Sequence, residues 1–184
     1  DISLGLVGSE MCIRDRFWMK LSYIIGKSKT LLISTLLCSL TLSAYIFIDT
    51  KDALPVLILL TIIYGIGYGA PFTLTRALMA DIVDADELRT ENKRPGLFYS
   101  ILTTFSKVGA AIAVGAVYSY LEWSGFRPGE VASEEVKGII LFVFAVMPMI
   151  LYFGASLLCI GYELTSEKHK EIQKALEARN NLSN

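Results

Sequence analysis

Four long stretches, each with no charge or a single one, constrain this chain more than any other feature. A helix needs about 20 mostly apolar residues to cross ~30 Å of hydrocarbon. No water reaches that depth, so each stretch must satisfy its own backbone as a helix. Only 19% of the 184 residues are charged, against about 25% in soluble domains. We therefore predict an all-α membrane protein with four transmembrane helices, at residues 30–48, 54–80, 97–121 and 138–162.

Lysine and arginine are distributed unevenly between the two sides of this bundle. One side carries ten, namely Lys20, Lys27, Lys29, Arg89, Lys93, Arg94, Lys168, Lys170, Lys174 and Arg179. The other side carries three, Lys51, Arg127 and Lys137. Because positive residues collect in cytoplasmic connections, we predict a multi-pass protein of the cell (inner) membrane. Its 81–96 loop and its C-terminal tail are then cytoplasmic.

Glycine and proline interrupt two of the predicted helices. Gly65, Gly67, Gly69 and Pro71 follow one another closely in the second span, and this cluster marks either a bend or hinge or a close helix contact. Pro148 is expected to kink the fourth span, because proline cannot donate a hydrogen bond to the preceding turn.

The two ends of the chain differ from the apolar stretches. Residues 1–16 (DISLGLVGSEMCIRDR) resemble a translated sequencing adapter, so we expect them to be foreign and omit their arginines from the charge count. The alternative is a genuine helix end and loop. Residues 163–184 are predicted to be a cytoplasmic tail containing a short surface helix, with Thr165 as its N-cap. His169, which lies among charges, is expected to be solvated.

Four further stretches carry a family resemblance. They are FWMKLSYIIGKSKT, ADIVDADELRTENKRPGLFYS, GFRPGEVASEEVKGIILFVFAVMP and ELTSEKHKEIQKALEAR. From Phe17 onward the chain resembles the last third of a sodium:sugar (melibiose-carrier-like) symporter of the glycoside–pentoside–hexuronide family, within the major facilitator superfamily. One departure concerns the family's common Thr-Gly-basic turn, which is replaced here by Thr90, Glu91, Asn92 and Lys93 and puts the geometry of that turn in question.

This resemblance implies a larger architecture. The four spans correspond to helices 9–12 of a twelve-helix fold, and residues 17–162 are the C-terminal part of its transporter domain. About two-thirds of the protein would then lie upstream, and we expect the full-length protein to be monomeric. Such transporters alternate access between two six-helix halves, with substrate and cation bound near the midplane. The coupling cation, Na+ or H+, would be bound mainly by the missing N-terminal half.

Lys107 is the sharpest candidate for a site. It lies ten residues into its predicted span, ~15 Å from the start, where a lysine costs ~2.5–3.5 kcal/mol unless it faces a cavity or a carboxylate. Ser100 and Thr103 share its helix face, and Ser106 flanks it. A lysine that only holds the bundle together is the alternative. The resemblance implies that Lys107 faces the cation- and sugar-binding carboxylates of the other half, and that Thr103 and Ser106 border the sugar site.

The 81–96 loop supplies a second set of candidates. The candidates there are four acids followed by three bases: Asp81, Asp84, Asp86, Glu87, Arg89, Lys93 and Arg94. We interpret them as a cytoplasmic gate whose ion pairs break when the inner side opens. A metal site at the Asp84–Asp86 pair is the weaker alternative, because basic residues surround it. No activated nucleophile, phosphate-binding glycine loop or metal-ligand spacing occurs, so we expect no enzyme, catalytic residue, metal or cofactor.

Three functions remain open at this point. The leading one is cation-coupled symport of a sugar or glycoside by alternating access. The second keeps the fold but carries another solute, such as a lysolipid, and would show an apolar groove that reaches the bilayer. The third is a non-transporting membrane subunit, against which an intramembrane lysine argues. The expected partners are the small-molecule sugar and the lipid bilayer, and no nucleic acid.

Overall fold

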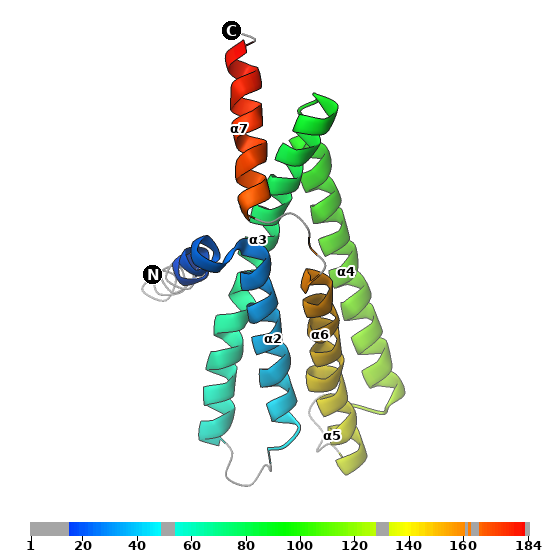
Figure 1. Ribbon diagram of the computed structural model, residues 1–184. Helices are drawn as coiled ribbons and strands as arrows, with labels where there is room; N and C mark the ends of the chain where they lie inside the picture. The colour runs from blue at the N-terminus through cyan, green and yellow to red at the C-terminus, as the bar shows by residue number, and fades with distance from the viewer. Residues whose placement is uncertain (1–14, 49–53, 128–132, 161, 163–165, 183–184) are drawn as a thin grey trace, which may run out of the picture.

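The computed structural model describes residues 15–48, 54–127, 133–160, 162 and 166–182. Every regular element in these ranges is a helix (Figure 1). A short helix over residues 15–25 is followed by α2 (Lys27–Tyr45), α3 (Leu54–Thr90), α4 (Pro95–Trp123), α5 (Glu134–Leu141), a π-helical turn η1 (Phe142–Val146), α6 (Met147–Ile160) and α7 (Ser166–Leu182).

Three helices in the described part of the chain are long and apolar enough to cross a membrane. They are Leu54–Thr90, Pro95–Trp123 and Glu134–Ile160, and they contain the second and third predicted spans and most of the fourth. The first predicted span is helical as α2 but is not one of the three. Helix α2 includes Lys27 and Lys29 in its first turn and ends before Ile46, Phe47 and Ile48. The helix is therefore less apolar than the predicted span 30–48.

The prediction of a loop over residues 81–96 is wrong for most of that segment, which is helical. Residues 81–90 continue α3, and only residues 91–94 connect it to α4. The acidic segment contains neither glycine nor proline, so nothing in it ends a helix. The helix ends at Thr90, and the next residue, Glu91, adopts a φ of 59°. Pro95 then opens α4, where its fixed φ suits a first helical position.

Helix α2 packs against both α3 and α6 and forms the centre of the described bundle (Figure 1). Its buried face is mostly small and hydroxylated, with Ser34, Cys38 and Ser39 among its members. Small residues allow helices to approach closely and hydroxyls to bond across the contact. Ser39 donates to the Met149 carbonyl of α6 at 3.2 Å, and Gly67 of α3 leaves room for the Cys38 thiol.

The helix over residues 15–25 lies across the start of α2 rather than along it (Figure 1). Trp18 fixes it to α3, because this side chain is 2% exposed and packs with Ala70 and Leu74. Its indole nitrogen donates to the Ile66 carbonyl at 2.8 Å. The π-helical turn lies immediately before Pro148 in α6, which is a common way for a helix to accommodate a proline.

Candidate functional site

The face of α4 that carries Lys107 is open in this structure. None of the α4 residues is buried. Ser100, Thr103 and Ser106 donate to carbonyls of their own helix, at 2.8, 2.7 and 2.8 Å. Their protons are therefore already bonded, but their oxygens can still accept hydrogen bonds. A ligand facing this side of α4 would meet hydroxyl oxygens and one ammonium group.

Lys107 lies near the middle of α4, ~18 Å from Pro95 and ~24 Å from Trp123 at the helical rise. The Tyr99 hydroxyl donates to the Arg76 carbonyl at 3.3 Å, which fixes the register of α4 against α3. Lys107 is exposed, and none of the ion pairs between described residues includes it.

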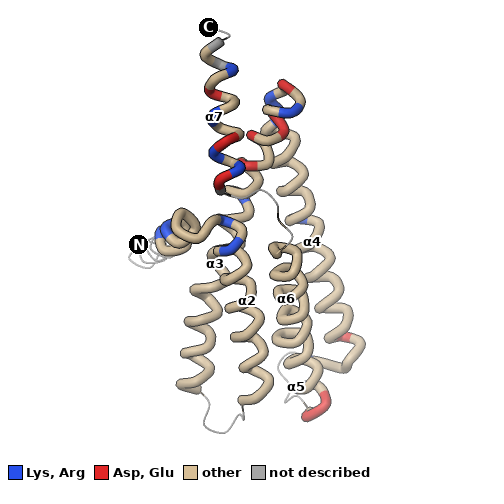
Figure 2. The backbone as a smooth tube through the Cα atoms, in the orientation of Figure 1, with Lys and Arg blue, Asp and Glu red and all other residues tan. Residues whose placement is uncertain are grey.

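The second set of candidates lies in the C-terminal part of α3 and in the connection to α4, beside α7 and the start of α2. Charged residues gather on α7 and at the upper end of the α3–α4 hairpin, whereas the helical segments below carry few (Figure 2). Asp81 is the centre of this group. Its carboxylate accepts from the Lys27 ammonium of α2 at 2.6 Å, and its side chain is 6% exposed.

His169 joins the tail helix to the same carboxylates. Its Nε2 lies 3.3 Å from Asp81 and 3.0 Å from Asp84, and its side chain is 12% exposed. The expectation that His169 is solvated is therefore wrong. It failed because α7 packs along α3, and no local pattern in the tail reveals that contact.

Glu87 makes the second connection between α7 and α3. It accepts from Arg179 at 3.1 Å, and its side chain is 13% exposed. Lys93 approaches the same carboxylate at 3.5 Å from the connection between α3 and α4. The tail helix thus contacts α3 at two places. His169 contacts Asp81 and Asp84, and Arg179 contacts Glu87.

The remaining gate candidates have other positions. Arg94 forms a bidentate pair with Asp86, with its closest contact at 2.9 Å. This pair bridges the short connection between α3 and α4. Arg89 is exposed. Lys27, His169 and Arg179 make the contacts that join separate helices, and none of them was among the predicted gate residues.

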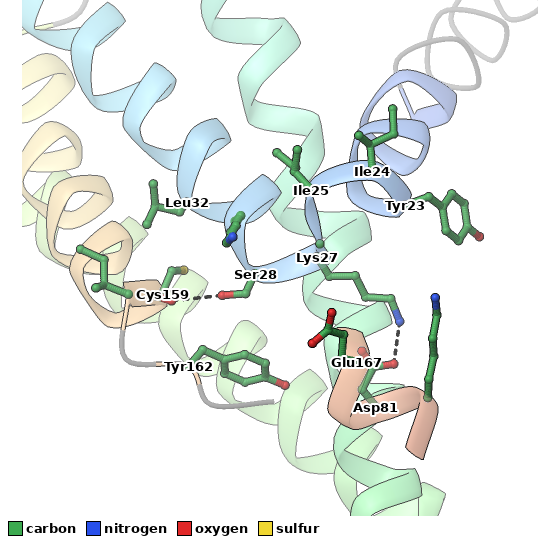
Figure 3. A pocket seen from close by; sticks show the side chains of 14 residues that line it. Tyr23, Ile24, Ile25, Lys27, Ser28, Leu32, Asp81, Cys159, Tyr162 and Glu167 are labelled. Carbon is green, nitrogen blue, oxygen red and sulfur yellow. Dashed lines mark hydrogen bonds and ion pairs between the residues drawn. The ribbon is translucent and has the colours of Figure 1, made fainter. Parts of the chain in front are cut away.

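A groove of about 690 Å³ lies beside this cluster (Figure 3). Ser28 is among its lining residues. Its hydroxyl donates to the Cys159 carbonyl at 3.1 Å and ties the start of α2 to the end of α6. Tyr162 also lines the groove.

Comparison with known proteins decides the family. Residues 3–166 match the family described as MFS/sugar transport protein. The chain belongs to this family. It is a family of transporters and not of enzymes, and its members span the membrane several times. The match begins within the head 1–16, of which residues 1–14 lie outside the described residues, so the foreign origin of this head stays a prediction.

Several curated relatives have names that indicate symport. The chain is 32% identical to a glucuronide carrier protein homolog of Escherichia coli over 84% of this chain and 34% of the relative. It is 33% identical to an uncharacterized symporter of Synechocystis over 65% of this chain and 23% of that protein. A sodium-dependent lysophosphatidylcholine symporter of mouse is 25% identical over 72% of this chain and 28% of the relative. The chain thus spans about a quarter to a third of these relatives.

Proposed function

We propose that this chain is the C-terminal part of a cation-coupled symporter that carries a sugar or glycoside. Lys107 is the observation that carries the proposal. A charge near the middle of an apolar helix, without an acidic partner among the described residues, requires a partner on another helix or in a polar cavity. Carboxylates of the other half, poised by this ammonium, would then bind the coupling cation and the substrate hydroxyls.

Ser100, Thr103 and Ser106 extend this site along α4. Their oxygens are available as acceptors, and a sugar presents hydroxyl donors in many directions. Among the relatives, one is named a glucuronide carrier protein homolog and another a putative glycoside/cation symporter. These names support a glycoside as the first substrate class to test.

The ion pairs at the end of α3 form the gate in this proposal. Asp81 pairs with Lys27 of α2, Glu87 pairs with Arg179 of α7, and His169 of α7 lies within bonding distance of Asp81 and Asp84, so these contacts join α3 to separate helices. Asp86 and Arg94 hold the hairpin and are expected to stay paired throughout the cycle. The contacts that break on opening are therefore those of Asp81, Asp84 and Glu87.

A lysolipid is the second candidate substrate. Relatives named sodium-dependent lysophosphatidylcholine symporters, at 24–26% identity, favour it. The test is uptake into vesicles that contain the full-length transporter, driven by a sodium or a proton gradient. Labelled glucuronide, methyl glycoside and lysophosphatidylcholine are compared. Accumulation of a glycoside supports the proposal, whereas accumulation of the lysolipid alone contradicts it.

A further inference from the structure

The groove beside the start of α2 is lined by both apolar and basic side chains (Figure 3). Ile24, Leu32 and Ile160 supply apolar surface from three different helices. Lys29 and Lys170 supply ammonium groups from α2 and α7. This combination fits a ligand with an anionic part and an apolar part.

The charge balance of the groove favours an anion. Its two acids are Asp81 and Glu167, and Asp81 is already bonded to Lys27 and lies beside His169. Lys29 and Lys170 are exposed, and no ion pair between described residues includes either of them. With Asp81 neutralised by Lys27, the two ammonium groups of Lys29 and Lys170 outnumber the single carboxylate of Glu167, so the groove carries a net positive charge. The first turn of α2, which has no side-chain cap, adds the positive end of its dipole.

The groove lies where the membrane surface is expected. The apolar helix that includes α6 ends at Ile160, and the helix over residues 15–25 lies across the bundle at the start of α2 (Figure 1). This short helix leaves Tyr23 and Ile24 78% and 79% exposed and also exposes Lys20. Exposed apolar and basic residues on one short helix are typical of a helix that lies in the membrane interface.

We propose that this groove binds the headgroup of an anionic phospholipid from the adjacent leaflet. Lys29 and Lys170 bind the lipid phosphate, and Ile24 and Ile160 contact the upper part of the acyl chains. Basic pockets between transmembrane helices hold anionic headgroups in this way. The apolar lining selects a lipid over free phosphate, which has nothing to place against it. The site is separate from the α4 face proposed for the transported substrate.

The test measures lipid binding to the purified full-length transporter by native mass spectrometry. The probes are phosphatidylglycerol and phosphatidylcholine with identical acyl chains, and inorganic phosphate is the competitor. The groove variant is Lys29→Ala with Lys170→Ala. The matched control is Lys137→Ala with Lys174→Ala, which also removes two exposed lysines but lies outside the groove lining.

The groove variant should bind phosphatidylglycerol ~30-fold more weakly, about fivefold for each lysine near a charged membrane surface. Its binding of phosphatidylcholine and the affinity of the control variant should change less than about threefold. An equal loss in both double variants would show a general effect of surface charge and overturn the proposal. Unchanged affinity in the groove variant, or full displacement of the lipid by inorganic phosphate, would overturn it as well.

Discussion

Asp81→Asn removes the charge that pairs with Lys27 and lies beside His169, and it keeps the shape of the side chain. The Asp81–Lys27 pair is 2.6 Å long, with side chains 6% and 25% exposed. The Glu134–Lys137 pair has nearly the same length, 2.7 Å, but its side chains are 90% and 55% exposed. Glu134→Gln is therefore a control that removes an equally short but exposed pair, one that lies within a single helix and joins no separate elements.

The expected magnitudes follow from this difference in burial. Removing one partner of a fully buried pair costs ~3–5 kcal/mol, whereas exposed pairs contribute ~0.2–1 kcal/mol. Lys27 keeps some contact with solvent, so Asp81→Asn should cost about 2 kcal/mol and Glu134→Gln less than about 1 kcal/mol. Asp81→Asn also takes from His169 one of its two carboxylates. Loss of that single contact, about 1 kcal/mol, lowers the ratio of docked to released tail helix about fivefold.

Distance measurement by electron paramagnetic resonance tests this expectation in the full-length protein. Spin labels at Arg89 and Glu177 are suitable, because both positions are exposed and outside the ion pairs. The starting protein and Glu134→Gln should each give one narrow distance. Asp81→Asn should add a longer and broader population. If Asp81→Asn and Glu134→Gln give the same distribution, the assignment of Asp81 as the centre of the contact is wrong.

Three further predictions concern topology and local packing. A single cysteine at Ala178 should react with an impermeant maleimide in inside-out vesicles only, and labelling in intact cells would reverse the predicted orientation. Gly67→Ala should destabilise the protein by about 1–3 kcal/mol, because its new methyl group would lie 2.9 Å from the Cys38 sulfur. At Gly65 an added Cβ would meet no atom within 4 Å beyond its own helix backbone and chain neighbours, so Gly65→Ala should be neutral. Thermal unfolding of both variants measures the difference. Glu91→Gly should stabilise by about 0.5–1 kcal/mol, since Glu91 has a φ of 59°, and a lower unfolding temperature would refute this.

Much of the helical architecture could be predicted from the sequence. Long apolar stretches have no alternative to a helix in hydrocarbon, so the spans that became α3, α4 and the helix through α6 were evident. The helix ends were harder to predict. Residues 81–90 are polar, and polarity alone suggested a loop, although the segment holds no residue that stops a helix. The signals that end α3 are Glu91, with its positive φ, and Pro95.

The charged contacts were predicted less completely. Asp86 and Arg94 lie on either side of one short connection, so their proximity follows from the sequence. His169 meets Asp81 only because α7 packs beside α3, a contact between residues 88 positions apart. Lys27 was counted only as a topology signal and Arg179 likewise, because nothing in their own segments indicates an acidic partner. Contacts of this kind depend on tertiary packing and leave no local pattern.

Lys107 is the residue of this chain proposed to take part in transport. Lys107→Leu should insert into the membrane well, because it removes a charge from the middle of a span. It should nevertheless abolish cation-driven uptake, since the carboxylates poised by this ammonium lose their partner. Lys107→Arg should also be impaired, because a planar guanidinium does not replace a compact ammonium. Lys137→Leu, which removes an exposed lysine from the first half of α5, is the control and should transport normally.

The direct measurement is accumulation of a radiolabelled glycoside in vesicles under an imposed sodium or proton gradient, with the amount of inserted protein determined in parallel. We predict that the starting protein and Lys137→Leu accumulate the substrate, that Lys107→Leu does not, and that all three are present in equal amount. If Lys107→Leu accumulates the glycoside as the starting protein does, then Lys107 is structural and the proposed site on α4 is wrong.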